Sequence, residues 1–146
     1  MYKIEKDRLG HMDLFRLKLG GFMKSDEVER CVADSTSALG DGISPFSVVM
    51  DIRSLMPLSE DAMNTMKEGQ QRLKEKGMVR SAVLVPNIMT KLHYERLAKE
   101  SGAILWERYF AAAEPNFEEA MNNWMENGKY DESPIAPLDI TKLITV

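Results

Sequence analysis

Residues 46–73 read FSVVMDIRSLMPLSEDAMNTMKEGQQRL, and this stretch decides the fold. The apolar run from Phe46 to Ile52 is typical of a strand that is buried on both faces, as the strands of parallel sheets are. After a short loop, Ser59 stands in the position of a helix N-cap before an amphipathic segment. A second apolar strand follows at residues 79–86. This strand–loop–helix–strand unit predicts an open α/β sheet, in which function usually lies beyond the carboxyl ends of the strands.

A hairpin is predicted before this unit. In residues 2–4 and 15–19, apolar side chains alternate with charged ones, which is typical of half-buried strands. The connection between the two strands is too short for a crossover, so we expect them to pair antiparallel. A helix follows, with Ser25 as its predicted N-cap and Gly40 as its stop.

Two more strand–helix units are predicted further along the chain. The strand already placed at 79–86, with its apolar centre at 81–85, leads to a helix capped by Asn87. A strand at 104–110 leads to a helix that opens at residues 114–116 and ends at Gly128. Strands and helices that alternate at this spacing predict parallel strands joined by right-handed crossovers. We therefore expect an α/β fold, with a five-stranded, mostly parallel sheet, an antiparallel edge strand and about four helices. The helix after Asn87 is expected to turn Met89 and Leu92 inward, together with either the stem of Arg96 or Leu97.

One domain with an extension is the expected organisation of the 146 residues. Residues 1–128 hold the predicted strands and helices. Residues 129–146 begin as a polar, proline-containing linker and end in β-favouring residues. Because apolar segments tend to be buried, we expect this extension to dock on its own domain or on the sheet edge of a partner copy, and the second case would make a homodimer.

Composition argues against several classes of protein. The chain has 19 Lys and Arg against 23 Asp and Glu, a net charge of −4, whereas nucleic-acid binding needs a clustered basic surface. The single cysteine, Cys31, excludes an intramolecular disulfide and a cysteine-based zinc cluster. No apolar run approaches the ~20 residues that span a bilayer, and the first residues do not resemble a signal peptide. The sequence therefore predicts a cytoplasmic protein that neither binds nucleic acid nor inserts stably into a membrane.

The sequence lacks several common motifs of catalytic and ligand-binding sites. Glycine-rich phosphate loops, G-x-S-x-G and H-E-x-x-H do not occur. The two histidines, His11 in a predicted turn and His93 on a predicted helix, have no spacing that suggests a metal site. We therefore expect no catalytic residue, no cofactor and no metal. An enzyme would have to use carboxylates such as Asp51 and Glu60 without an obvious partner base.

The polar residues of the opening segment are expected at the carboxyl edge of the sheet. Asp51 ends the predicted strand, and Ser59, Glu60 and Asp61 begin the predicted helix. A helix start favours bound anions, but the two acidic side chains already occupy this one and oppose a phosphate, so we expect no nucleotide site. The alternative to a functional role is a structural one for both residues: Ser59 would be the N-cap of the helix, and the Asp51 carboxylate would cap the loop.

The order of elements, with VVMDIRSL leading through a loop and a helix to GMVRSAVLVP, resembles a STAS domain, the fold of bacterial anti-sigma-factor antagonists. The closing pattern ERYFAAAEPNFEEAMNNWM is similar to the branch described as stage II sporulation protein AA-like, which is related in shape to SEC14-type lipid-binding domains. The resemblance covers residues 1–127. It implies a single STAS/SEC14-like domain that acts by binding a protein partner.

One part of the antagonist pattern is missing. Antagonists carry an Asp-Ser-Ser-Gly-like signature with a regulatory phosphoserine at the start of the second helix, and the corresponding residues here are Leu58, Ser59, Glu60, Asp61 and Ala62. Two acidic side chains stand where the phosphorylatable serine would be. The comparison with the family therefore implies a module without the phosphoserine switch.

Two functions follow from these observations. The first is a non-enzymatic interaction or regulatory module, whose partner surface is the acidic helix start and the residues before it: Asp51, Arg53, Met56, Leu58, Ser59, Glu60 and Asp61. The alternative is a small carrier of a lipid or another apolar ligand, which the SEC14-like resemblance and the 11 methionines suggest. Its pocket would lie between helices and sheet, lined by Met63, Met66, Met89 and Trp106.

Overall fold

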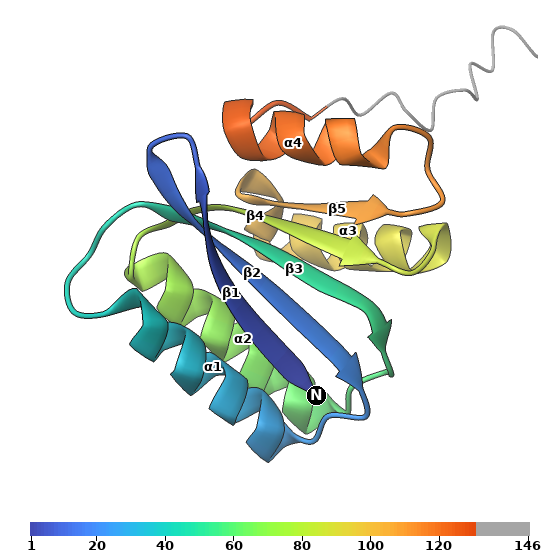
Figure 1. Cartoon of the computed structure of the whole chain (residues 1–146). Coiled ribbons are helices and arrows are strands. Elements are labelled where there is room, and N and C mark those ends of the chain that lie inside the picture. Colours follow the sequence, from blue (N-terminus) through green and yellow to red (C-terminus); the bar gives the residue numbers. More distant parts are fainter. Residues whose placement is uncertain (131–146) are drawn as a thin grey trace, which may run out of the picture.

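Five strands and four α-helices make up residues 1–130, the part of the chain that the computed structural model describes (Figure 1). The predicted docking of the terminal extension falls on residues 131–146 and lies outside the described residues. The elements in chain order are β1 (Tyr2–Leu9), β2 (Met12–Gly21), α1 (Ser25–Leu39), β3 (Phe46–Leu55), α2 (Glu60–Glu75), β4 (Met78–Val85), α3 (Ile88–Ser101), the short 3-10 helix η1 (Ala103–Leu105), β5 (Glu107–Ala111) and α4 (Phe117–Asn127).

The strands form one sheet in the order β1-β2-β3-β4-β5. β1 pairs antiparallel with β2, and every later pair of neighbours is parallel, joined by a crossover through α1, α2 or α3. This arrangement confirms the predicted α/β fold, with its mostly parallel sheet, antiparallel edge strand and four helices.

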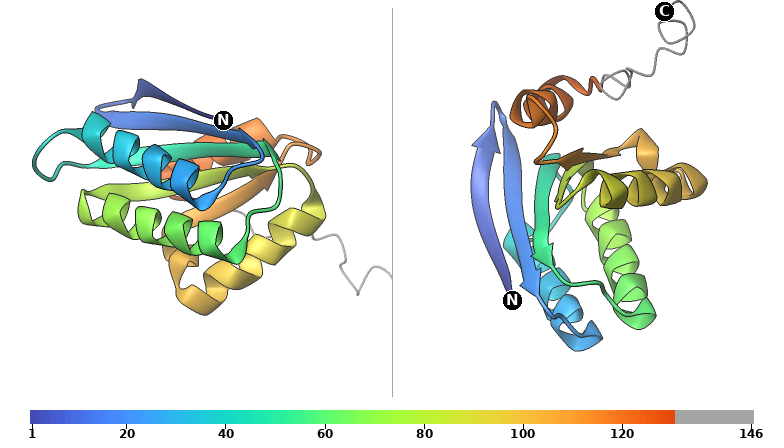
Figure 2. Two further views of the ribbon diagram at one scale, coloured as in Figure 1. Left: turned by 90° about the horizontal axis from the view of Figure 1, so that it is seen from below. Right: turned by 90° about the vertical axis from the view of Figure 1, so that its right-hand side faces the viewer.

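Helices cover the two faces of the sheet unequally. α1, α2 and α3 lie on one face, and α4 lies on the other, over β4 and β5 (Figure 1, Figure 2). The larger core, under the first three helices, contains Phe15, Phe46 and Met50, whereas Trp124 of α4 packs with Leu84 in a second core. Because β3 and β4 contribute to both cores, they carry the continuous apolar runs that the sequence shows.

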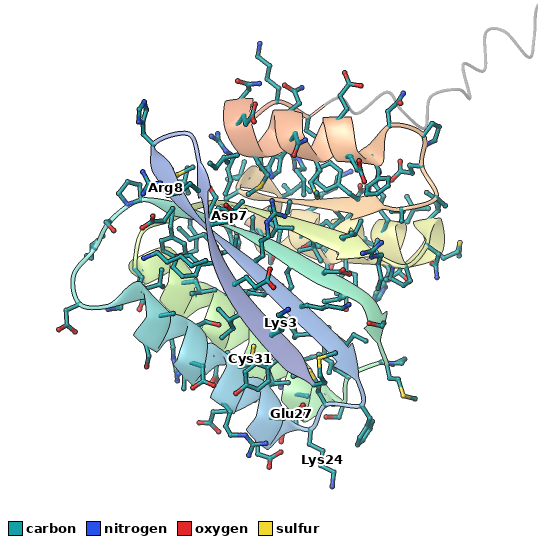
Figure 3. The ribbon with its side chains drawn as sticks, in the orientation of Figure 1. Lys3, Asp7, Arg8, Lys24, Glu27 and Cys31 are labelled. Atoms are coloured by element: carbon teal, nitrogen blue, oxygen red, sulfur yellow. The ribbon has the colours of Figure 1, made fainter. Side chains whose placement is uncertain are left out.

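On the α4 side of the sheet, Leu14 of β2 and Val49 of β3 still belong to the second core, but charged side chains occupy β1 and the part of β2 beside it. Lys3 pairs with Glu5 at 2.8 Å, and Arg16 pairs with Asp7 at 3.2 Å. Figure 3 shows Lys3, Asp7 and Arg8 along β1. These charges keep the edge strand polar, which discourages pairing with another chain.

β3 is longer than the sequence predicts. It runs to Leu55, so Arg53 belongs to the strand and not to the loop that follows it. After an irregularity between Lys18 and Gly20, β2 continues to pair with β3, and Gly21 lies opposite Leu55. The apolar pattern does not reveal this extension, because the added residues are partly polar and are held by backbone pairing.

Two further boundaries differ from the predicted ones. α1 begins at Ser25 itself, and the Ser25 hydroxyl does not cap the helix but lies 2.9 Å from Thr65 Oγ1 of α2. β5 begins at Glu107, because the residues before it form η1. The predicted N-caps Ser59 and Asn87 are confirmed, since each side chain accepts a hydrogen bond from a backbone N–H of its helix.

α3 turns a different face inward from the predicted one. Met89 is 77% exposed and Leu92 is 46% exposed, so their expected burial is wrong. Of the two alternatives for the third position, Leu97 is half-buried and Arg96 is exposed. Lys91 is buried instead, and its ammonium donates to the Glu114 carboxylate at 2.7 Å. A pattern that counts only apolar residues misplaces this face, because a paired charge takes the inward position.

Candidate functional site

The starts of α1 and α2 lie side by side at the carboxyl edge of the parallel strands (Figure 1, Figure 2). The two helices can approach closely because Gly69 of α2 faces Val32 of α1, where a Cβ would overlap Val32 Cγ2. Nearer the helix starts, Ser25 Oγ and Thr65 Oγ1 form a hydrogen bond of 2.9 Å. The close contact brings together two first turns that are far apart in the sequence.

Both of these first turns are acidic. Asp26 and Glu27 begin α1, and Glu60 and Asp61 begin α2. Glu27 is half-buried (Figure 3), whereas the other three carboxylates are exposed. Negative charge is stabilised at a helix N-terminus by the helix dipole. The Ser59 hydroxyl completes the start of α2 by accepting the N–H of the third residue after it at 3.1 Å.

An exposed apolar patch, formed by Phe22 and Met56, lies beside these helix starts. Phe22 is 65% exposed and Met56 is 55% exposed. The two residues are on neighbouring segments, because the Met56 N–H donates to the Gly21 carbonyl at 3.0 Å. Leu58 is half-buried and packs against the core, so it anchors the loop. Phe22 was not among the predicted site residues. Its exposure could have been suspected from the sequence, because it follows the end of a strand of alternating residues.

Asp51 and Arg53 lie on the opposite face of the sheet from the first three helices. Met50 and Ile52 belong to the core under those helices, and side chains alternate along a strand. The Asp51 carboxylate accepts hydrogen bonds from Arg53 Nε at 3.0 Å and Nη2 at 2.8 Å. The Arg53 guanidinium holds the pKa of Asp51 below its ordinary value. The structure therefore separates this pair from the rest of the predicted partner surface.

A cavity of about 460 Å³ lies between α2 and α3, above the sheet. Met63 and Met66, two of the residues predicted to line a pocket, form part of its wall. Trp106 does not line it and packs at the edge of the core, with the Lys74 ammonium 5.1 Å from the ring centroid. Met89 also lies outside it, on the exposed side of α3. A cavity is thus present between helices and sheet, with a wall that differs from the predicted one.

Glu107 lies at the base of this cavity and is the polar residue that the sequence analysis missed. It is 2% exposed and accepts hydrogen bonds from Ser81 Oγ at 2.9 Å, Gln70 Nε2 at 3.1 Å and Tyr109 Oη at 2.5 Å. Burial raises the pKa of Glu107, while these three hydrogen bonds oppose the rise. The burial of Glu107 could have been predicted from the sequence, because strand alternation puts it on the same face as Tyr109 and Ala111.

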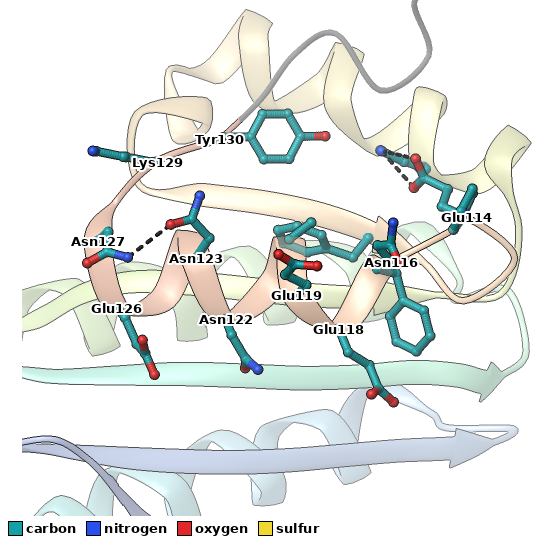
Figure 4. Close-up of a pocket in the computed structure, with 15 residues that line it drawn as sticks. Glu114, Asn116, Glu118, Glu119, Asn122, Asn123, Glu126, Asn127, Lys129 and Tyr130 are labelled. Carbon is teal, nitrogen blue, oxygen red and sulfur yellow. Dashed lines mark hydrogen bonds and ion pairs between the residues drawn. The ribbon is translucent and has the colours of Figure 1, made fainter.

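A second, wider depression of about 750 Å³ lies along α4 (Figure 4). The charged side chains Lys91 and Glu114 in its lining form hydrogen bonds with each other. The Lys91 ammonium donates to both carboxylate oxygens of Glu114, at 2.7 and 2.9 Å, and the Tyr130 hydroxyl donates to Glu95 at 3.2 Å. The first contact fastens the connection between β5 and α4 to α3, and the second fastens the residue Tyr130, after α4, to α3, so we assign both a structural role.

The remaining candidate chemistry is limited within residues 1–130. Cys31 is 5% exposed, and burial raises the pKa of its thiol to about 11, which disfavours the reactive thiolate at neutral pH. No group of three or more His, Cys, Asp or Glu in this part of the chain is arranged to hold a metal ion. None of the described helices is long and apolar enough to cross a membrane.

Comparison with known proteins identifies the fold. No protein-family model and no curated protein matches the chain. A similar solved structure is that of an uncharacterised DUF3478-family protein with a SpoIIAA-like fold from Shewanella loihica PV-4, with a TM-score of 0.63 and 18% sequence identity over 85% of this chain and 93% of that one. The chain therefore has a SpoIIAA-like fold, and the resemblance to STAS-like proteins is confirmed at the level of the fold.

Proposed function

We propose that this chain is a non-enzymatic interaction module of STAS-like type, and that it binds a protein partner through the Phe22/Met56 patch. The observation that carries this proposal is the exposure of two large apolar side chains on neighbouring segments, 65% for Phe22 and 55% for Met56. Interfaces commonly combine an apolar centre, rich in aromatic residues and methionine, with a polar rim. The engagement of Ser59 as a cap and of Asp51 in an ion pair supports the non-enzymatic part of the proposal.

The charges around the patch indicate the chemistry of the partner. Asp26, Glu60 and Asp61 are exposed at the two adjacent helix starts, and Lys24 is a basic exception (Figure 3). A partner with an apolar anchor bordered by Lys or Arg would complement this surface. Complementary charges of this kind speed association and suppress wrong partners.

The start of α2 supports a module that works without a phosphoserine switch. The Ser59 hydroxyl is engaged as the N-cap of the helix. A phosphate on it would add about −1.5 to −2 charge beside Glu60 and Asp61, where like charges repel. On this proposal, the two carboxylates give the surface a permanent negative charge, and regulation comes from the amount or state of the partner.

Affinity capture from a lysate of the source organism tests the proposal. The baits are the wild type, Phe22→Ser and the double variant Glu60→Arg/Asp61→Arg. We expect the wild type to retain a protein that both variants lose. The matched control is Glu118→Arg/Glu119→Arg, which reverses the acidic first turn of α4 on the other face of the sheet and should retain that protein.

The captured protein is then purified and titrated against each bait. Because the rim is charged, its affinity for the wild type should fall as the salt concentration rises. Thermal unfolding of each bait separates the loss of a surface from the loss of the fold. Partner sets that are identical for the wild type and both patch variants would remove this surface from consideration.

A further inference from the structure

The cavity between α2 and α3 has the size and walls of a small-molecule site. Its volume is about 460 Å³, and ligand sites typically measure roughly 300–1,000 Å³. Met63 and Met66 of α2 and Leu97 of α3 supply apolar wall, and methionine adapts readily to the shape of a ligand. None of the lining residues belongs to the Phe22/Met56 patch or its acidic rim. The cavity is therefore a second site, independent of the proposed partner surface.

The Glu107 carboxylate at its base has acceptor capacity to spare. Oε1 accepts from Ser81 Oγ and from Gln70 Nε2, whereas Oε2 accepts from Tyr109 and has only a long contact, 3.4 Å, with Gln70. Each carboxylate oxygen can accept about two hydrogen bonds. Gln70 also lines the cavity, so rotation of its side chain would open Oε2 to a bound molecule.

The electrostatics of the site favour a cation. Within residues 1–130, no Lys, Arg or His forms an ion pair with Glu107. A buried carboxylate without an opposite charge is costly, and a cationic ligand would offset that cost. Tyr94 and Tyr109, whose rings stack with centroids 5.6 Å apart, also line the cavity, and aromatic faces attract ammonium groups. Lys67 and Glu100 carry opposite charges in the same lining.

We infer that this cavity binds a small, mainly apolar amine whose ammonium group donates to Glu107. The ammonium replaces the long contact from Gln70, and the apolar body of the amine lies against the methionine wall. A carboxylic acid of the same shape would bring a second negative charge to Glu107. A hydrocarbon of that shape would leave the Glu107 charge uncompensated.

Calorimetric titration of the full chain with tryptamine tests this inference. The matched probes are indole-3-propionic acid, which carries a carboxylate in place of the ammonium, and 3-ethylindole, which lacks a charged group. We expect tryptamine to bind at least about tenfold more tightly than either probe. Its binding should shift amide NMR signals of α2, α3 and β5.

Three variants locate the contact. Glu107→Gln should weaken tryptamine binding by about tenfold or more, and Leu97→Trp, which fills the cavity, should abolish it. The control Glu118→Gln on α4 should bind as the wild type does. If Glu107→Gln does not fold, Leu97→Trp and the probe series still decide. Any one of three results would overturn the inference. Tryptamine does not bind at millimolar concentration, or the acid or 3-ethylindole binds equally well, or a folded Glu107→Gln binds tryptamine as the wild type does.

Phe22→Ser should bind tryptamine normally, which keeps this test separate from that of the partner surface.

Discussion

The Ser59 hydroxyl accepts the Ala62 N–H at 3.1 Å, and this side-chain bond caps the first turn of α2. Removing it in Ser59→Ala should lower the free energy of unfolding by about 1 kcal/mol, because that N–H loses its partner. Ser59→Asp keeps an acceptor and should be close to wild type. Urea denaturation measures both values.

The same two variants examine the proposed absence of a phosphoserine switch. Both should capture the partner of the wild type, because the proposed contact surface is the apolar patch and its carboxylates. Loss of the partner by Ser59→Asp alone, with the fold intact, would instead indicate a switch at Ser59 that responds to added negative charge.

Glu107 gives a pH dependence whose sign can be worked out. Burial raises the pKa of Glu107 above its ordinary value, despite the hydrogen bonds that oppose the rise. The folded chain therefore holds this proton more strongly than the unfolded chain does. The contribution of the group to stability is complete below the unfolded pKa of about 4.3 and is lost as pH rises through the folded pKa.

Replacing this carboxyl by an amide should remove that dependence. We expect the free energy of unfolding of Glu107→Gln, minus that of the wild type, to increase with pH above about 4.3 and then to level off. Urea titrations at a series of pH values give this difference. Glu118→Gln, on the exposed side of α4, corrects for the general effect of removing one negative charge. A difference that falls as pH rises would contradict the raised pKa.

At the scale of elements, the contact between α1 and α2 holds the two acidic helix starts together. Gly→Ala in the middle of a helix normally stabilises it by about 1 kcal/mol. At Gly69 the added methyl would overlap Val32 Cγ2, and a β-branched side chain has little freedom to move away. We therefore expect Gly69→Ala to destabilise the protein, since overpacking typically costs about 1–3 kcal/mol.

A second substitution should reverse that sign. In a Val32→Ala background both Cγ atoms are gone and the nearest atom of residue 32 is its Cβ, at 3.3 Å, so Gly69→Ala should stabilise the chain by up to about 1 kcal/mol through helix propensity. Denaturant unfolding of the four chains of this double-mutant cycle measures the effect. If Gly69→Ala has the same effect in both backgrounds, the two helices do not approach as closely as described.

Burial within an element was harder to predict from the sequence than its existence. The helix after Asn87 was recognised by its cap, but its inward face was assigned to Met89 and Leu92, which are exposed. The position turned inward is Lys91, which is acceptable only because Glu114 lies opposite it across the β5–α4 connection. Such a pairing depends on tertiary structure, and single-sequence periodicity does not contain it.

At the scale of the whole molecule, the topology could be predicted because handedness leaves few choices. Successive parallel strands added in one direction by right-handed crossovers place α1, α2 and α3 on one face. No described strand follows α4, so this rule does not fix its side, and its apolar stripe around Trp124 instead covers the other face of β4 and β5. The candidate site was predicted in part, since the acids of α2 are adjacent in sequence, whereas their proximity to Asp26 requires the packed pair of helices.

The open charged face of the sheet leads to a prediction about association. β1 is an edge strand whose outward residues include Lys3 and Glu5, paired at 2.8 Å. An exposed pair of this kind contributes only about 0–1 kcal/mol to stability. The two charges matter more for solubility, because a flat apolar edge would offer unpaired backbone groups to another chain.

Lys3→Val/Glu5→Val should therefore leave the unfolding midpoint almost unchanged and increase self-association, seen as a light-scattering mass that rises with concentration. Glu29→Val/Arg30→Val removes the same charges from α1, where the helix already satisfies its backbone, and should associate less. Equal association of the two variants would show that lost charge, and not the exposed edge, causes it.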